Sequence, residues 1–433
     1  MPVTASNPLS HTGSIADDSI VAAVSALGVK VRDASRVVAT ASSRVRDAAL
    51  LAAADGLEQA AVAIVAANAV DVARAGSEGV SPTVVDRLRL DVSRVGAMAT
   101  GLRQVAALAD PVGEVLGGWV RPNGLRIEQV RVPLGVVAII YENRPNVTSD
   151  AAGLCLKSGN AAFLRGSSGA IESNLAIVAV LRSALESVGL PADAVTLLAD
   201  TSREAAVAFM QQRGVVDCLI PRGGPALIAS ILEHATVPFV IDGDGNCHVY
   251  VDAAADLAMA ERIVVNAKTQ RPSVCNAAET LLVHADVADE FLPRIAVALS
   301  GVELLGDERT RALIPGAGVA DDEAYATEFL DLRMSVAVVD SVDDAIDHIR
   351  RYTSGHSEAI VTGDLATAEH FTRQVDAAAV LVNASTRFVD GEEFGFGAEI
   401  GISTQKLHAR GPMALRELTT AKYIVHGSGQ VRA

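Results

Sequence analysis

The chain is poor in aromatic residues, in cysteine and in positive charge. Lys and Arg total 36 against 52 acidic residues, which leaves a net charge of −16. A field of that sign repels phosphate backbones, so nucleic-acid binding is not expected. Aromatic residues make up only 3% of the 433 residues, whereas 50% are hydrophobic. This composition is typical of packed α/β layers rather than disorder, and the length predicts at least two domains.

The scarcity of cysteine also excludes some classes of site. Cys155, Cys218, Cys247 and Cys275 are widely spaced and form no CxxC pair, so neither a metal site nor a disulfide framework is expected. Reduced thiols fit a cytoplasmic protein. The first 20 residues lack a basic segment followed by an apolar core, and no apolar run approaches about 18 residues. We therefore expect neither a signal peptide nor a transmembrane helix.

The order of local patterns predicts an α/β protein. The pattern is helical over residues 17–76 and 91–108, and Asn-Gly at positions 123–124 predicts a β-hairpin over residues 115–132. Strands and helices then alternate, which indicates parallel sheets with helices on both faces. The strands expected first are 136–141, 161–164, 195–198, 218–220 and 239–241. The alternation resumes after Gly245 as a second α/β domain, and residues 421–426 read as a final strand.

One cysteine stands in a setting that suits a nucleophile. Cys275 follows a polar loop with two cations, Lys268 and Arg271, and precedes an apolar run. A free thiol is only about 3% thiolate at pH 7. Nearby cations raise that fraction. The alternative interpretation is a small buried hydrophobic residue, which is the commonest role of cysteine.

Two glycine-rich turns are candidates for phosphate binding. Arg165 follows an expected strand and could pair with a phosphate through two hydrogen bonds, while Lys157 and Gly159 precede the same strand. Backbone N–H groups at Arg222-Gly-Gly224 could hold a pyrophosphate, although no GxGxxG fingerprint is present. Ordinary turns with solvated arginines remain the alternative.

Two further side chains have a functional and a structural interpretation. Asn146 follows a strand and could donate a hydrogen bond to an oxyanion, or it could cap the next helix. Arg387 lies among small polar residues, which indicates a carboxylate pocket or a surface loop. The histidines 248, 356 and 408 show no ligand spacing.

In this order, these segments resemble the aldehyde dehydrogenase superfamily and, within it, the γ-glutamyl phosphate reductase family. The resemblance covers residues 132–412 and is carried by VPLGVVAIIYENRPNVTSDAAGLCLKSGNAAFLRGSS, DCLIPRGG, IDGDGNCHVYVD, NAKTQRPSVCNAAETLLVH, TEFLDLRMSV and VNASTRFVDGEEFGFGAEIGISTQKLHARGP. It implies an aldehyde dehydrogenase-like fold with two parallel-sheet α/β domains and a β-hairpin oligomerisation flap. The implied domains are an NADP-binding domain (1–118 and 133–242, with 380–412 returning to it), a catalytic domain (243–379) and a flap (119–132 and 413–433).

The resemblance also implies roles for single residues. Cys275 corresponds to the nucleophile and Asn146 to an oxyanion donor. The implied cofactor-binding residues are Arg165, placed to meet the 2′-phosphate of NADP, and Lys157, Gly159, Arg222, Gly223, Gly224 and Glu328. Glu328 corresponds to a glutamate on the nicotinamide ribose. Charge complementarity adds Arg271 and Lys268 for the substrate phosphate and Arg387 for the substrate α-carboxylate.

The implied reaction is the NADPH-dependent reduction of L-γ-glutamyl 5-phosphate to L-glutamate 5-semialdehyde through a Cys275 thioester, the second step of proline biosynthesis from glutamate. Oxidising relatives carry a glutamate base in an ELGG motif, and the corresponding stretch here, residues 240–245, has none. A homo-oligomer is expected, with the upstream glutamate 5-kinase as a natural partner. An oxidising or CoA-acylating aldehyde dehydrogenase and a non-catalytic binding protein are the rival interpretations.

Overall fold

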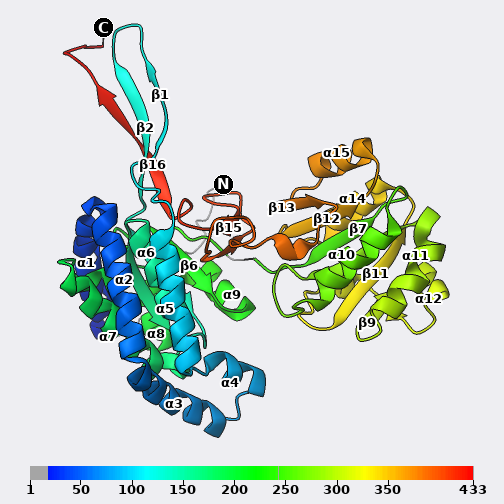
Figure 1. Cartoon of the computed structure of the whole chain (residues 1–433), viewed down its shortest axis with the longest axis horizontal. Coiled ribbons are helices and arrows are strands. Elements are labelled where there is room, and N and C mark those ends of the chain that lie inside the picture. The colour runs from blue at the N-terminus through cyan, green and yellow to red at the C-terminus, as the bar shows by residue number, and fades with distance from the viewer. Residues whose placement is uncertain (1–17, 242, 433) are drawn as a thin grey trace, which may run out of the picture.

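Two lobes and a long β arm make up the molecule (Figure 1). The computed structural model describes residues 18–241 and 243–432. The expectations for residues 1–17, including the absence of a signal peptide, and for Asp242 lie outside the described residues.

Helices open the first lobe. The bounds are α1 (Asp18–Thr40), α2 (Ser43–Gln59), α3 (Ala61–Ser77), α4 (Pro82–Leu88) and α5 (Val92–Ala107). The helical pattern expected over residues 17–76 is thus divided into three, and α2 meets α3 at a bend of 69°. Along α2, residues Ala49, Leu50, Ala53 and Leu57 are buried, a spacing of three to four residues that places them on one face.

The first sheet has four parallel strands in the order β5-β4-β3-β6. Its elements are β3 (Val136–Tyr141), α6 (Asn146–Lys157), β4 (Ala161–Gly166), α7 (Ile171–Ser187), β5 (Val195–Leu197), α8 (Arg203–Met210), β6 (Cys218–Arg222) and α9 (Pro225–His234). Every residue of β3 is buried, which matches its unbroken apolar sequence.

One expected strand of this lobe is absent. Residues 239–241 form a single bridge, between Leu219 and Phe239, in place of the strand predicted there. The two hydrogen bonds are Leu219 N–H to the Pro238 carbonyl and Val240 N–H to the Leu219 carbonyl. Pro238 on this segment and Pro221 on β6 have no N–H to donate, so the pairing does not extend in either direction.

Helix α7 is long and apolar, so we considered whether it could span a membrane. Among the described residues, Ser168–Ser187 is long and apolar enough to cross a bilayer, and the bent pair α2–α3 passes the same test as a unit. However, Ile177, Leu181 and Leu185 of α7 are buried in the core of the first lobe. We therefore interpret α7 as a core helix.

The second lobe holds a seven-stranded sheet in the order β10-β9-β11-β8-β7-β12-β13, with all pairs parallel. Its elements are β7 (Cys247–Val251), α10 (Leu257–Thr269), β8 (Ala278–His284), α11 (Ala285–Ala298), β9 (Glu303–Gly306), α12 (Glu308–Leu313), β10 (Gly318–Val319), α13 (Asp322–Ala326), β11 (Arg333–Val339), α14 (Val342–Tyr352), β12 (Ser357–Val361), α15 (Leu365–Gln374) and β13 (Ala379–Val382). Strand β13 pairs with β12, so the chain leaves this sheet after residue 382 rather than at residue 380 as expected.

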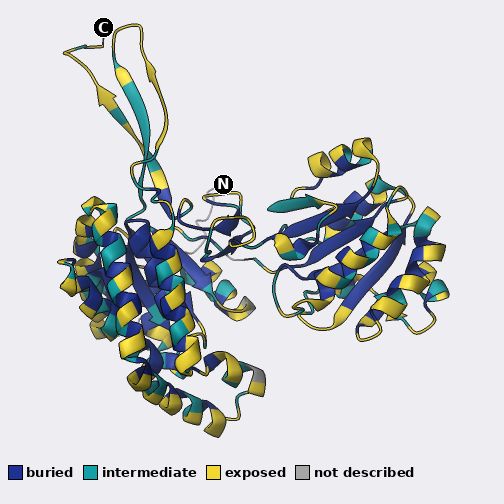
Figure 2. Ribbon diagram, in the orientation of Figure 1, coloured by how far each residue is buried: buried dark blue, intermediate teal, exposed yellow. Residues whose placement is uncertain are grey.

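The chain then returns to the first lobe through a short hairpin, β14 (Gly401–Ser403) and β15 (Gly411–Met413). Buried residues of this segment, Ile400 and Met413 among them, pack in the core of the first lobe. In Figure 2 the central strands of both sheets are buried, and the outward faces of the helices are exposed.

The arm is an antiparallel sheet of β1 (Val115–Val120), β2 (Arg126–Pro133) and β16 (Thr419–His426), in the order β1-β2-β16. It projects from the first lobe, and β1 is exposed along its whole length (Figure 2). Trp119 and Tyr423 pack edge to face, with ring centroids 6.2 Å apart. The arm begins at residue 115, four residues before the expected boundary.

Candidate active site

The carboxyl ends of three neighbouring strands bring the predicted cofactor loops together. Tyr141 at the end of β3 is paired with Gly166 of β4 on one side and with Arg222 of β6 on the other. The loops after these strands therefore meet at one edge of the sheet. This is where open α/β sheets bind ligands.

Helix α9 presents an open N-terminus at this edge. Gly224 caps α9, and a Cβ built at Gly224 would have no atom within 4 Å. The Gly224 N–H donates to the Glu142 Oε2 atom at 3.3 Å, so a carboxylate already lies where the helix favours an anion. Phosphate oxygens would find the same donors.

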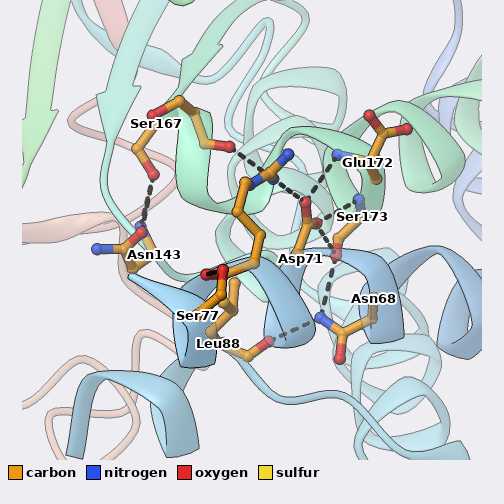
Figure 3. A network of polar contacts seen from close by, with 10 residues as sticks. Asn68, Asp71, Ser77, Leu88, Asn143, Ser167, Glu172 and Ser173 are labelled. Carbon is orange, nitrogen blue, oxygen red and sulfur yellow. Dashed lines mark hydrogen bonds and ion pairs between the residues drawn. The ribbon is translucent and has the colours of Figure 1, made fainter. Parts of the chain in front are cut away.

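The N-terminus of α7, by contrast, is filled by a side chain of the protein (Figure 3). The buried Asp71 carboxylate accepts hydrogen bonds from the Ser173 N–H at 2.9 Å and the Ser173 hydroxyl at 2.6 Å. Arg74 pairs with Asp71 and also donates to the Ser168 carbonyl at 2.8 Å. The loop after β4 is therefore braced from α3, and the helix end behind it is not free for a ligand.

Arg165 lies in β4 at this edge, with its guanidinium partly buried. Its Nη2 donates to the Thr201 carbonyl at 2.8 Å, while its buried Nε has no hydrogen-bond partner among the described residues. Burial lowers the pKa of Arg165, and the carboxylates of Glu142 and Asp200 oppose that shift. A guanidinium with an unused buried donor can accept an anionic ligand.

The structure corrects two predicted cofactor contacts. Lys157 is buried, and its Nζ donates to Asp47 at 2.6 Å and to the Ala106 carbonyl at 2.7 Å. Gly159 has φ +79° and ends α6, where a Cβ would lie 2.6 Å from Pro133. Both residues precede β4, whose length, roughly 15 Å, separates them from the carboxyl edge. Their roles are structural.

Cys275 lies in the second lobe, in the loop between α10 and β8. Among the four cysteines, all in the described part of the chain, Cys275 is the one that is partly exposed. Burial raises the pKa of Cys247 well above its usual value and that of Cys218 to about 12. Burial raises the pKa of Cys155 as well, so all three buried thiols stay protonated near neutral pH, and Cys275 is the thiol that solvent can reach.

The surroundings of Cys275 include Glu328. A Cβ at Gly245 would lie 1.6 Å from the Cys275 carbonyl oxygen, so these two backbone segments are in direct contact and require glycine. The Gly245 N–H donates to the Glu328 Oε1 atom at 2.8 Å. Glu328, predicted from the resemblance, therefore binds the same glycine that lies against the backbone of Cys275.

Lys268 is a third correction. It has no exposed surface, and its Nζ donates to the Glu279 Oε2 atom at 2.6 Å. An ammonium enclosed in this way does not reach a substrate phosphate. Sequence reasoning missed Glu279, although a carboxylate inside the apolar run of residues 277–283 is a signal of a buried polar partner.

Arg387 contacts the Cys275 loop and is close enough to Arg271 to feel its charge. Arg387 Nε donates to the Gln270 side chain at 2.8 Å, and Asn276 Nδ2 donates to the Val389 carbonyl at 2.9 Å. Burial and, after it, the cation of Arg271 lower the pKa of Arg387. A cavity of about 260 Å³ is lined by Arg387 together with Asn266, Gln270, Phe388, Asp390, Glu392 and Glu393.

Asn146 lies in the other lobe, at the first residue of α6. Its Nδ2 donates to the Asp150 Oδ2 atom at 2.9 Å, and α6 is capped by Pro145 rather than by this side chain. Burial raises the pKa of Asp150 to about 6, opposed by the hydrogen bond from Asn146. One amide hydrogen is therefore held by Asp150, and the other has no acceptor among the described residues.

Comparison with known proteins agrees with this geometry. Residues 12–328 match the aldehyde dehydrogenase family. A γ-glutamyl phosphate reductase from Moorella thermoacetica is 58% identical over 407 residues, which cover 94% of this chain and 97% of that protein. This chain belongs to the γ-glutamyl phosphate reductase family.

Solved structures extend the family assignment to the fold. A γ-glutamyl phosphate reductase from Thermotoga maritima has a TM-score of 0.93 at 48% identity, covering 95% of this chain and all (100%) of that one. An acetylating aldehyde dehydrogenase from Geobacillus thermoglucosidasius, at 15% identity and a TM-score of 0.67, covers 96% and 98% and shows the same fold. The expected family and fold class are confirmed, and the chain is an oxidoreductase of the aldehyde dehydrogenase type.

Proposed function

We propose that this chain reduces L-γ-glutamyl 5-phosphate to L-glutamate 5-semialdehyde and phosphate with NADPH, as the second step of proline biosynthesis from glutamate. The observation that carries the proposal is the partly exposed Cys275 beside two arginines, in a chain of the γ-glutamyl phosphate reductase family. An acyl phosphate offers both an electrophilic carbonyl for the thiolate and an anion for the arginines.

The residues at the edge of the first sheet fit a phosphorylated dinucleotide. Arg165 has an unused buried donor, and the exposed N-terminus of α9 has a backbone N–H, now bound to Glu142, of the kind that phosphates require. Arg165, Arg222, Gly223 and Gly224 would hold NADPH from the first lobe, and Glu328 from the second. When bound, NADPH supplies the hydride that converts the Cys275 thioester into the aldehyde.

Cys275 carries the covalent chemistry. Its thiolate attacks the γ-carbonyl carbon, a C–S bond forms, and the C–O bond to phosphate breaks, so that a thioester remains on Cys275. Phosphate is a good leaving group and needs little acid assistance. Asn146 would donate its free amide hydrogen to the oxyanion, with Asp150 holding the amide in orientation.

Charges beside the nucleophile suit the remaining groups of the substrate. Arg271 would meet the phosphate, and Arg387 the α-carboxylate. Asp390 and Glu393 line the same cavity as Arg387, and their negative charges raise the pKa of Arg387 against the effect of burial. Their charge suits the α-ammonium group of a glutamyl substrate, and together these residues would recognise an amino acid end.

The same proposal includes an oligomeric state, a cellular location and a partner enzyme. The exposed three-stranded arm, with Trp119 and Tyr423 on its surface, would pair with another copy of the chain in a homo-oligomer. We place the enzyme in the cytoplasm, where reduced thiols persist. The glutamate 5-kinase that makes the acyl phosphate is the natural partner, because acyl phosphates hydrolyse readily.

The test is NADP reduction with glutamate 5-semialdehyde, with and without inorganic phosphate. We expect turnover that requires phosphate, because the reverse reaction must regenerate the acyl phosphate. Turnover without phosphate would contradict the proposal and indicate an oxidising aldehyde dehydrogenase. Turnover that requires CoA instead would indicate an acylating relative.

A further inference from the structure

The two residues that border the nucleophile loop are joined by a buried ion pair. Lys268 is in the last turn of α10 and Glu279 is the second residue of β8, so the loop that carries Cys275 runs between them. Their side chains meet at 2.6 Å, and neither has any exposed surface. The pair therefore holds together the two ends of the Cys275 loop.

The second oxygen of Glu279 reaches another segment. Its Oε1 atom accepts a hydrogen bond from the Leu330 N–H at 3.3 Å. Leu330 has φ +55°, a left-handed conformation that a branched side chain rarely adopts and that persists where the surroundings impose it. Glu279 thus anchors the loop between α13 and β11 at its most unusual residue.

That loop also carries Glu328. Two residues before Leu330, the Glu328 carboxylate accepts the Gly245 N–H at 2.8 Å, and Gly245 lies against the Cys275 carbonyl. Burial and, to a lesser extent, the charge of Glu328 raise the pKa of Glu279. The buried Glu279 carboxylate is therefore linked to the Cys275 loop through Lys268 and to the Glu328 loop through Leu330.

Stability gives little reason for a buried pair of this kind. Removing two charges from water is costly, and replacing such pairs with apolar residues of similar volume is often neutral or stabilising. Burial lowers the pKa of Lys268 and raises that of Glu279, so burial disfavours both charged forms. The pair is therefore better explained by the two segments that it joins than by a contribution to the free energy of folding.

We propose that Lys268 and Glu279 are positioning residues, which fix the Cys275 loop and the Glu328 loop relative to each other. The inference rests on the proposed roles of Cys275 and Glu328. Neither Lys268 nor Glu279 touches substrate or cofactor. Loss of Glu279 should therefore disturb the nucleophile and the cofactor ribose contact together.

Three variants and three measurements (steady-state kinetics, hydrogen exchange and melting temperature) test the pair. Glu279→Ala removes both contacts and should lower kcat at least tenfold, raise the KM for NADPH several-fold, and speed hydrogen exchange over residues 270–277 and 327–332 together. Glu279→Gln keeps an acceptor for Leu330, so it should retain the NADPH KM while losing part of kcat. Lys268→Met with Glu279→Leu replaces the pair with apolar volume and should keep the melting temperature while showing the Glu279→Ala kinetics.

The matched control is the ion pair between Arg46 and Asp110 in the first lobe, where Arg46 is also buried. Arg46→Met with Asp110→Leu should leave exchange over residues 270–277 and 327–332 unchanged. The proposal is wrong if a folded Glu279→Ala protein exchanges hydrogen in those segments at the wild-type rate. It is also wrong if the increase in exchange rate is no larger than in the control variant. If Glu279→Ala does not fold, the apolar double variant is judged by the same criteria. Hydrogen exchange requires no substrate, so a wild type without reductase activity would refute the proposed function and leave this test intact.

Discussion

The first lobe offers its proposed ligand an open backbone, whereas the second lobe holds its reactive loop by buried side chains. At the edge of the first sheet, Gly224 faces open space, and the anion-binding end of α9 is exposed. Around Cys275, a glycine in direct contact and a fully buried ion pair confine the loop. A cofactor that enters and leaves needs accessible donors, and a nucleophile needs a restrained geometry.

The two lobes also use their buried lysines differently. Lys157 pairs with Asp47 below the first sheet, away from the ligand edge, while Lys268 pairs with Glu279 next to the nucleophile loop. Both were expected to contact ligands, and both are enclosed. A lysine near a functional motif is therefore no guide to a ligand contact unless its burial is known.

The largest effect should come from the second lobe. Cys275→Ala removes the nucleophile and should lower turnover by roughly 10⁴-fold or more, while NADPH binding in the first lobe persists. Steady-state kinetics and fluorescence titration with NADPH measure the two effects. Cys218→Ala, which removes a buried thiol of the first lobe, is the control and should stay active. Residual reduction by the Cys275→Ala enzyme would assign the nucleophile elsewhere.

Asn146 tests whether the first lobe takes part in the chemistry. Asn146→Ala should lower kcat roughly 10²- to 10³-fold with little change in KM, because an oxyanion donor acts mainly in the transition state. Initial-rate kinetics against the acyl phosphate give both constants. A raised KM with unchanged kcat would show instead that Asn146 binds the ground state.

Arg165 sharpens the comparison at the cofactor edge. Arg165→Ala should weaken NADPH binding about 10- to 100-fold more than NADH binding, since a hydrogen bond to a charged group is lost only with the 2′-phosphate. Arg182→Ala, which breaks an ion pair with Asp193 in the same lobe, is the matched control. Equal weakening of both cofactors would remove the 2′-phosphate role.

The smallest effect is a pH dependence of stability from Asp150. Burial raises its pKa to about 6, above the usual value of 3.8, so ionisation costs the folded state. This contribution is fully present below pH 3.8 and is lost as the pH rises through about 6. Relative to Asp150→Asn, the wild type should lose stability between pH 4 and pH 7, which is measured as a fall in its melting temperature. If the melting temperatures of the two proteins change by the same amount between pH 4 and pH 7, the prediction is wrong.

Much of the fold could be read from local patterns. The strand at residues 136–141 was predicted with its bounds, because a buried parallel strand is a continuous apolar run between breaking residues. The hairpin of the arm followed from its Asn-Gly turn. The expected strand at residues 239–241 was wrong, because proline on each of the two paired segments leaves no N–H to extend the single bridge.

The candidate site divides in the same way. Residue types and spacing, with the family resemblance, singled out Cys275, Asn146, Arg165 and Glu328. They did not reveal Glu279, whose partners Lys268 and Leu330 come from segments 11 and 51 residues away in the sequence. Such pairings are set by how α10, β8 and the α13–β11 loop pack.

The sequence by itself determined the α/β class and the family, and it singled out Cys275 as the proposed nucleophile, because periodicity, glycine turns and motif chemistry are properties of neighbouring residues. Only the tertiary structure decided which charges meet ligands and which meet each other. Lys157 and Lys268 resemble binding residues in the chain, and burial turned both into structural partners. Desolvation depends on every atom that surrounds a charge, and those atoms come from distant parts of the sequence.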